Sequence, residues 1–571
     1  MTTTADRSQG RPSPEEVGAP GGSALDTMLA DAAGPVRRWL PGTAGLRLVG
    51  HLAGRPGAVA KRTGGLAAEL AKVAIGRSEV APPKGDRRFT DPAWQGNPVL
   101  ARLCQGYLAT AATAKQLLDD ADLDWRDDHR VRFLAGNVLD AVAPSNVPML
   151  NPAAVKAAID SGGRNYLKGG TQLVKDVARR RTPAMVDETA FEVGRELAIT
   201  EGQVVLRTPV VELIQYSPRA ARVREVPLLV VPPMINKYYV TDLAPGRSMV
   251  ESYLDSGLQV FAMSWRNPTA EHAAWGLDTY AGAVLECLDA VEKITGSGRT
   301  HVLGVCAGGI TSSVALSHLA ATSRLDRVAT LSLGVTVLDQ ERAGTMGSFV
   351  DKGMAATAVA GSQRRGYLDG KALAGVFAWL RPNDLVWNYW VNNYLLGKRP
   401  PAFDVLYWNA DSTRMPAGLH RDFLEMAVDN SLVTPGRARV LGSPVDLGKL
   451  DVDSYLVAGV ADHICPWQNC YRSTQMLGGT KRFVLSTSGH IAALVNPPGN
   501  PKATYSVHED ECPPDPEQWK REAVTRQGTW WTDHTAWLGE RSGGDKAAPK
   551  TLGAKGYRPL QAAPGAYVLE R

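Results

Sequence analysis

The sequence predicts an α/β protein built on a doubly wound, mostly parallel sheet, and two observations support this fold class. Short runs rich in Val, Leu and Ile recur after residue 205, each with the length of a buried strand. Stretches with helical periodicity separate these runs, so each strand can be followed by a helix that crosses over the sheet. The expected strands are 227–231, 258–264, 300–305, 329–335, 452–458 and 481–486, and the expected helices include 280–295 and 309–322.

The region before the sheet is predicted to be mainly helical. With 571 residues, the chain is longer than one compact core usually requires. Residues 1–24 are rich in Gly, Pro, Ser and Thr and are expected to be disordered. Between 25 and 204 we expect helices at 58–75, 100–124, 152–160 and 166–181. The helix at 58–75 is amphipathic, which leaves two interpretations: it packs on the main domain, the more ordinary case, or it lies on a hydrophobic surface.

The main domain is expected to span residues 205–540 and to contain a cap. Residues of about 340–445 interrupt the strand pattern and are rich in Trp, Tyr and Asn. An insertion at this point lies over the carboxyl ends of the strands, where α/β sheets bind their ligands. We therefore interpret it as a cap, and treat residues 541–571 as a C-terminal tail with no assigned role.

The composition argues against nucleic-acid binding, a membrane span and a metal site formed by paired cysteines. A net charge of +5 is small for this length and does not indicate nucleic-acid binding. No apolar stretch reaches the roughly 18 residues of a membrane span, and the first residues lack the order of a secretory signal. The six cysteines lack paired metal-ligand spacing, and Cys465 and Cys470 alone make a poor metal site. We expect a cytoplasmic protein with reduced thiols and no metal or redox cofactor.

One segment, HVLGVCAGGI at 301–310, places a cysteine where a buried strand ends. Gly304-Val305-Cys306-Ala307-Gly308 has the strand–turn–helix setting of a G-x-S-x-G nucleophile elbow, with sulfur in place of the hydroxyl. Glycines flank the nucleophile because the tight turn leaves no room for a Cβ. The N-terminus of the following helix favours thiolate, so we expect the pKa of Cys306 to lie below about 8.5. The alternative is a structural cysteine before a glycine turn.

Two later strand ends supply the partners of such a nucleophile. Asp462 follows the strand at 452–458, and His490 follows the strand at 481–486. This is the chain order of nucleophile, acid and histidine in the α/β-hydrolase fold, so the sequence predicts a Cys306–His490–Asp462 triad. The oxyanion is expected to bind the N–H of Ala307 and an N–H near Ile235, in the loop after the strand at 227–231. His463 is expected to point away from Asp462 and to be either a structural residue or one that supports the triad from outside.

The segments surrounding these residues resemble one family, the polyhydroxyalkanoate synthases, which polymerise (R)-3-hydroxyacyl-CoA. The resemblance extends over about residues 85–540 and is closest to the single-subunit synthases. It implies a polymerising acyltransferase that releases CoA, needs no cofactor, and acts as a cytoplasmic homodimer at the surface of polyester granules. The segments are DRRFTDPAW, FLAGNVLDAVAPSNVPMLNP, VPPMINKYYVTDLAPGRSMV, FAMSWRNP, GVCAGG, LYWNADSTRMP, VAGVADHICPW, SGHIAALVNPPGN and WWTDHTAWLGERSG.

The resemblance also explains why sulfur replaces oxygen at the elbow. A cysteine keeps the acyl group as a thioester, which a 3-hydroxyl of another unit can attack to form the more stable oxoester. Either His490 or Asp462 is expected to take the proton of that hydroxyl. Aromatic residues of the cap are expected to form a dry channel, namely Trp387, Tyr389, Trp390, Tyr407 and Trp408. The expected substrate contacts are Tyr407 and Trp408 of the cap and Asn236 of the loop after the strand at 227–231. Basic residues at the CoA entrance include the candidates Lys237, Arg266 and Arg399, which the sequence does not distinguish from ordinary surface charges.

Two other functions compete with polymerisation. A thioesterase or lipase-like hydrolase would use the same triad to pass the acyl group to water. A non-catalytic scaffold at inclusion surfaces would use the amphipathic helix at 58–75 and need no triad. The cysteine and the breadth of the resemblance favour the polymerase.

Overall fold

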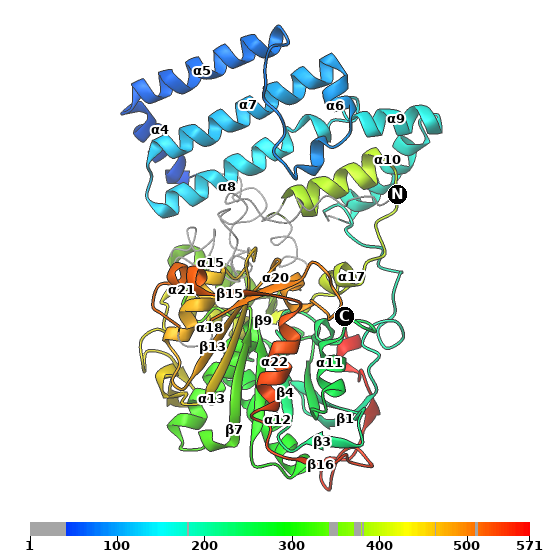
Figure 1. The fold of residues 1–571 in the computed structure, drawn as a ribbon, viewed down its shortest axis with the longest axis vertical. Helices are drawn as coiled ribbons and strands as arrows, with labels where there is room; N and C mark the ends of the chain where they lie inside the picture. Colours follow the sequence, from blue (N-terminus) through cyan, green and yellow to red (C-terminus); the bar gives the residue numbers. More distant parts are fainter. Residues whose placement is uncertain are drawn as a thin grey trace, which may run out of the picture.

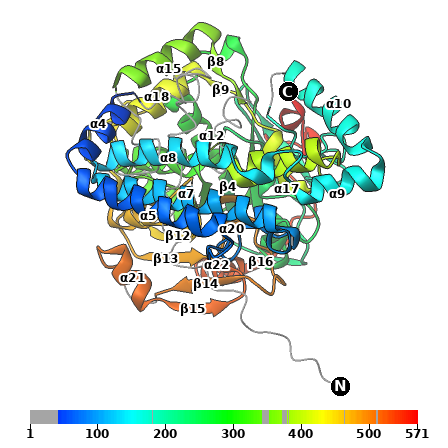
Figure 2. The ribbon, with the colours of Figure 1, turned by 90° about the horizontal axis from the view of Figure 1, so that it is seen from above.

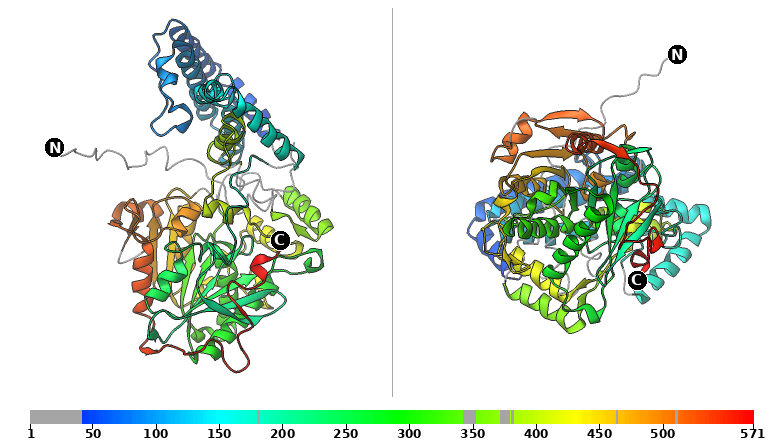
Figure 3. Two further views of the ribbon diagram at one scale, coloured as in Figure 1. Left: turned by 90° about the vertical axis from the view of Figure 1, so that its right-hand side faces the viewer. Right: turned by 90° about the horizontal axis from the view of Figure 1, so that it is seen from below.

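The computed structural model describes residues 42–179, 182–341, 352–370, 379, 382–462, 464–508 and 512–571. A helical bundle from the first part of the chain stands above an α/β domain, as Figure 1 and the left view of Figure 3 show. The expected disorder of residues 1–24, the expected orientation of His463 and parts of the expected cap lie outside the described residues. None of the described helices has both the length and the apolar character needed to cross a membrane.

An eleven-stranded sheet forms the centre of the α/β domain, and its order is β15-β14-β13-β12-β7-β6-β4-β5-β2-β1-β17. The strands from β13 to β5 are parallel, and antiparallel strands complete both edges. All the strands expected from the sequence lie in the parallel part, so the predicted α/β-hydrolase fold class is confirmed. The bounds are β1 (Gly202–Arg207), β2 (Val211–Tyr216), β4 (Leu228–Val231), β5 (Val260–Trp265), β6 (Thr300–Val305), β7 (Val328–Gly334), β12 (Asp453–Gly459), β13 (Lys481–Ser486), β14 (Thr504–Val507), β15 (Val524–Gln527) and β17 (Gln561–Ala562).

Helices cover both faces of this sheet, which explains why the central strands read as continuous apolar runs. Every residue of β4, β5, β6 and β7 is buried. Helices α12 (Leu277–Thr295) and α13 (Ala307–Ala321) pack together over β4 and β6. Helices α11 (Met249–Asp255) and α22 (Trp530–Gly539) pack against each other on the opposite face (Figure 1). Shorter helices follow β12, β13 and β14: α19 (Trp467–Arg472), α20 (His490–Leu494) and α21 (Pro516–Glu522), respectively.

The N-terminal bundle has small cores of its own. It contains α4 (Gly42–Ala53), α5 (Pro56–Ala74), α6 (Ala93–Gly96), α7 (Pro98–Ala121), α8 (Trp125–Ala141), α9 (Pro152–Ser161) and α10 (Arg164–Ala178). One cluster joins Ala44, Leu118 and Val131, and another joins Phe89, Trp94 and Cys104. The amphipathic helix expected at 58–75 is α5, and it packs along α7 rather than on the main domain. Figure 2 shows α5, α7 and α8 side by side across the top of the molecule.

The insertion after β7 divides into a part that contacts the bundle and a part that contacts the sheet domain. It contains α15 (Lys352–Arg365), the π-helical segments η6 (Asn383–Trp387) and η7 (Trp390–Leu395), α17 (Asp404–Ala410) and α18 (Ala417–Val428). Segment η7 packs so closely on α10 that a Cβ at Gly169 would lie 1.9 Å from the carbonyl oxygen of Tyr394. The indole of Trp390 donates a hydrogen bond of 3.1 Å to the carbonyl of Asn146. Helix α18 instead packs on α12, and Phe423 belongs to the main core.

The C-terminal tail is part of the α/β domain. Strand β16 (Asp545–Ala547) pairs with β3 (Arg222–Arg224), and β17 extends the main sheet beyond β1. The last turn, η10 (Tyr567–Leu569), buries Tyr567 and Val568, and the chain ends near α17 (Figure 1). These short strands were not predicted, because the sequence shows no strand periodicity in this segment.

Candidate active site

The turn after β6 holds Cys306 in a strained backbone conformation. Its φ of 51° lies in the left-handed region, which residues with a side chain rarely adopt. A Cβ at Gly304 would lie 2.5 Å from Cα of Gly309, and one at Gly308 would lie 2.3 Å from the carbonyl oxygen of Val231. The glycines are therefore required by the close approach of β6, α13 and the end of β4. The nucleophile-elbow geometry expected from the sequence is present.

The residues of the predicted triad lie together at the carboxyl ends of three parallel strands. Asp462 follows β12, and His490 is the first residue of α20, directly after β13. Nδ1 of His490 donates a hydrogen bond of 2.7 Å to Oδ2 of Asp462, and a nitrogen of the same ring lies within 4.8 Å of the Cys306 Sγ. The three residues are only 6–7% exposed. This arrangement suits nucleophilic acyl transfer, in which the histidine takes the proton of the thiol.

The carboxylate of Asp462 uses both of its oxygens within the site. Oδ1 accepts hydrogen bonds from the backbone N–H groups of Ile464 at 2.8 Å and Cys465 at 2.9 Å, while Oδ2 binds His490. The side chain is fully buried. One carboxylate therefore fixes both the imidazole ring and the turn that carries Cys465.

The expected direction of the Cys306 pKa was wrong. The neighbouring thiol of Cys465 and burial both raise the pKa of Cys306 well above its ordinary value, although hydrogen bonding and charge from His490 oppose this. Burial disfavours protonation of His490, but Asp462 and the hydrogen bond with Cys306 outweigh it and raise the pKa of His490 to about 10. The two groups titrate as a pair. Within the pair, charge from His490 favours the thiolate of Cys306, and charge from Cys306 favours the imidazolium of His490.

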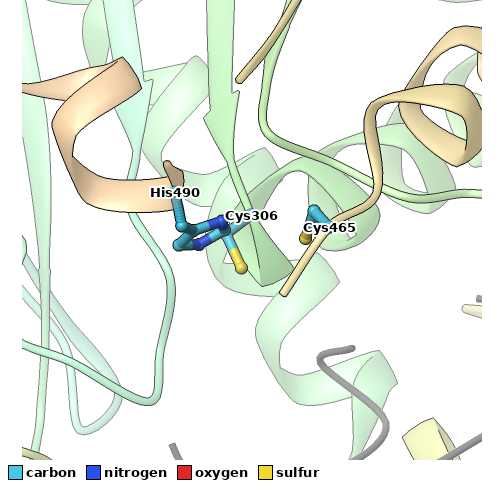
Figure 4. A group of neighbouring side chains, drawn as sticks. All are labelled: Cys306, Cys465 and His490. Carbon is cyan, nitrogen blue, oxygen red and sulfur yellow. The ribbon is translucent and has the colours of Figure 1, made fainter. Parts of the chain in front are cut away.

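Cys465 is the neighbour that the sequence interpretation missed. Its Sγ, the Sγ of Cys306 and a ring nitrogen of His490 all lie within 4.8 Å of one another, and Figure 4 shows the three side chains converging. The sequence treated Cys465 only as one half of a weak cysteine pair. The available signal was local: an aspartate that accepts from the N–H groups two and three residues ahead folds the chain back, which brings Cys465 beside the triad.

The two residues expected to form the oxyanion hole lie on adjoining segments. Ala307 begins α13, and Ile235 lies in the loop after β4. The close approach of Gly308 to Val231 places the start of this loop against the elbow. Thr413 fixes the loop, because its N–H donates to the carbonyl of Ile235 at 3.2 Å. The oxyanion role of Ala307 and Ile235 stays a prediction.

The residues expected to contact substrate connect α17 to the same loop. The indole of Trp408 donates to the carbonyl of Lys237 at 2.7 Å, and Asn236 forms a backbone bridge with Ser412. The ring of Tyr407 packs edge-on against Phe191. These contacts hold the loop in place, and the role of Tyr407, Trp408 and Asn236 in substrate binding stays a prediction.

The other aromatic residues of the insertion and two of the basic candidates have partners that the sequence did not indicate. Trp387 and Trp390 stack edge to face, and Trp390 also donates to the carbonyl of Asn146; their role as channel lining stays a prediction. Nζ of Lys237 is buried and donates to the carbonyls of Tyr567 at 3.3 Å and Glu570 at 2.5 Å. Arg266 binds the carboxylate of Glu570 at 3.2 Å. Lys237 therefore holds the C-terminal tail instead of lining a CoA entrance.

Comparison with known proteins gives the family. Residues 85–253 match the model of the poly-beta-hydroxybutyrate polymerase (PhaC) N-terminus, and residues 241–497 match the alpha/beta hydrolase fold. Poly(3-hydroxyalkanoate) polymerase 1 of Ectopseudomonas oleovorans is 46% identical over 90% of this chain and 91% of its own length. The chain belongs to the poly(3-hydroxyalkanoate) polymerase family. Within this family, the PhaC polymerase subunit of Cupriavidus necator is 40% identical over 87% of this chain and 85% of its own.

Solved structures with a related chain trace are more distant. An esterase from Exiguobacterium antarcticum covers 51% of this chain and 92% of its own at 16% identity, with a TM-score of 0.31. The family assignment rests on the sequence relatives.

Proposed function

We propose that this chain polymerises (R)-3-hydroxyacyl-CoA into polyester, with release of CoA, through a thioester on Cys306. The observation that carries the proposal is that the Cys306 thiol lies beside the ring of His490, which in turn is hydrogen-bonded to the buried Asp462. A thiol paired with an oriented base is the arrangement of an activated nucleophile. Membership of the polymerase family supports the class of product.

In the first step, the thiol accepts the acyl group. The ring nitrogen of His490 that faces Cys306 takes the Sγ proton, and Sγ attacks the thioester carbonyl of the substrate. The N–H groups near Ala307 and Ile235 would stabilise the oxyanion. As the intermediate collapses, the bond from carbon to the CoA sulfur breaks, and CoA leaves with the proton from His490. One thioester replaces another, so little free energy is lost.

In the second step, the 3-hydroxyl of another unit attacks the thioester on Cys306. His490 takes the hydroxyl proton, the ester C–O bond forms, and Sγ leaves and recovers the proton. We assign this proton transfer to His490 rather than Asp462, because both oxygens of Asp462 already accept hydrogen bonds and its side chain is fully buried. The hydroxyl therefore has no access to that carboxylate.

Water must be kept from the acylated thiol, since hydrolysis would end the chain. Cys306, Asp462 and His490 are each 6–7% exposed, which supports transfer to an alcohol over transfer to bulk water. The family resemblance also supports a cytoplasmic homodimer at the granule surface. Light scattering of the purified chain, with and without polyester particles, tests that part of the proposal.

Incubation of the purified chain with (R)-3-hydroxybutyryl-CoA tests the function. We expect CoA release together with insoluble polyester. CoA with free 3-hydroxybutyrate would instead indicate a hydrolase, and no CoA release a scaffold. Cys306→Ala should abolish CoA release, whereas Cys512→Ser, at a thiol on the far end of β13, should leave it unchanged. Turnover by Cys306→Ala would refute the assignment of the nucleophile.

A further inference from the structure

We propose that Cys306, Cys465 and His490 form a binding site for a thiophilic divalent cation, Zn²⁺, which reversibly inhibits the enzyme. The inhibition rests on the proposed function, whereas the binding of the cation does not. The three donor atoms all lie within 4.8 Å of one another and come from the elbow, the turn after β12 and the start of α20. Figure 4 shows that both sulfur atoms and the imidazole ring face the same space.

The donor set and its spacing fit tetrahedral zinc. Two thiolates and one imidazole, with a fourth position left for water, are a recognised zinc coordination. Zn–S bonds of about 2.3 Å and Zn–N bonds of about 2.0–2.1 Å at tetrahedral angles separate the donors by about 3.6–3.8 Å. Donors within 4.8 Å of one another therefore need to approach by no more than about 1 Å, which side-chain rotation of the cysteines supplies.

The surroundings of the donors add a second, independent argument. A histidine that binds a metal usually donates its other ring N–H to a carboxylate, which fixes the ring and strengthens the ligand. Nδ1 of His490 makes this hydrogen bond to Asp462 at 2.7 Å, so Nε2 remains for the cation. Oδ1 of Asp462 accepts from the N–H of Cys465 at 2.9 Å. A single carboxylate thus orients two of the three ligands.

The chemistry of the donors selects the cation. Sulfur and imidazole ligands favour Zn²⁺ and Cd²⁺, whereas Mg²⁺ and Ca²⁺ require oxygen ligands. Binding displaces the Sγ protons of Cys306 and Cys465 to solvent. The cation then occupies both the nucleophilic sulfur and the nitrogen that takes its proton, so acylation stops until the cation leaves.

Cd²⁺ absorbance tests binding without any substrate. Each thiolate bound to Cd²⁺ contributes to an ultraviolet charge-transfer band, so we expect a signal of two thiolates from the native chain and of one from Cys465→Ala. A one-thiolate signal from the native chain would overturn the proposal. Because this readout needs no turnover, it stands even where the polymerase proposal fails.

Zn²⁺ titration of CoA release tests the inhibition, with each variant compared with its own rate without Zn²⁺. Loss of one ligand should raise the Zn²⁺ concentration for half inhibition at least about 100-fold in Cys465→Ala. Cys512→Ser should remain as sensitive as the native chain, and Mg²⁺ should not inhibit. EDTA should restore activity. Equal sensitivity of Cys465→Ala would show that Cys465 is not a ligand, and inhibition that EDTA does not reverse would indicate thiol oxidation instead. If Cys465→Ala fails to fold, Cys465→Ser provides the same comparison.

Discussion

The substitution Gly308→Ala tests whether the elbow and the oxyanion loop depend on their close packing. An added Cβ would lie 2.3 Å from the carbonyl oxygen of Val231 and 2.6 Å from that of Pro232. Ordinary contact begins near 3.4 Å, so one side must move by about 1 Å. β4 cannot easily yield, because it is hydrogen-bonded between β5 and β6. The displacement therefore falls on the turn at Cys306 or on the loop that carries Ile235.

The size of the effect follows from this displacement. Overpacking of a buried site costs about 1–3 kcal/mol, and a shift of about 1 Å in a catalytic group can slow a reaction about 100-fold. We expect Gly308→Ala to lower the melting temperature and to slow the first-turnover burst of CoA by about 100-fold, measured by rapid quench.

A matched control separates this clash from a general effect of an added methyl group. Gly170→Ala places a Cβ in α10 with no atom within 4 Å, and it should stabilise the helix by about 0.5–1 kcal/mol without changing the burst. A native burst rate and melting temperature in Gly308→Ala would refute the role assigned to this contact.

Three further changes have expected outcomes. Cys306→Ser should give little polymer, because an oxoester on serine is a poor acyl donor; a near-native polymer yield would defeat the thioester argument. Asp462→Asn should lower the pKa of His490 from about 10, so that less imidazolium is present to stabilise the thiolate of Cys306. The pH midpoint of Cys306 alkylation by iodoacetamide should therefore move to higher pH. An unchanged or lower midpoint would contradict this sign. Deletion of residues 567–571 leaves buried Lys237 without its carbonyl partners and should cost about 1–3 kcal/mol of stability. The midpoint of urea unfolding should fall accordingly. Lys237→Met in the deletion variant should raise this midpoint again. Equal stability of the deletion variant and the full chain would show that the tail does not hold Lys237.

The triad was predictable because strand ends are recognisable in the sequence. Cys306, Asp462 and His490 each follow an apolar run, and parallel strands bring their carboxyl ends to one edge of the sheet. The direction of the Cys306 pKa was not predictable in the same way. It depends on burial and on Cys465, whose position results from a turn around Asp462.

The sequence also did not predict the strands of the C-terminal tail or the contact between the bundle and the insertion. β17 contributes two residues to the sheet and has no strand period to detect. Its pairing with β1 joins Gln203 and Ala562, which are far apart in the chain. Trp390 was expected to line a channel, but composition alone does not indicate a packing contact such as the hydrogen bond that its indole donates to the carbonyl of Asn146.

Burial has opposite effects on the two requirements of the proposed chemistry. It keeps water from the acylated Cys306, but it also raises the pKa of the thiol and so reduces the fraction of thiolate. The thiolate therefore needs a partner of opposite charge in the same dry site. His490 supplies that partner: Asp462 helps to raise its pKa to about 10, which favours the imidazolium, and the charge of the imidazolium in turn favours the thiolate of Cys306. An enzyme that transfers acyl groups to water has less need for a buried thiol with a charged partner. In such an enzyme, an exposed nucleophile would be easier to deprotonate, and water could reach the acylated sulfur directly.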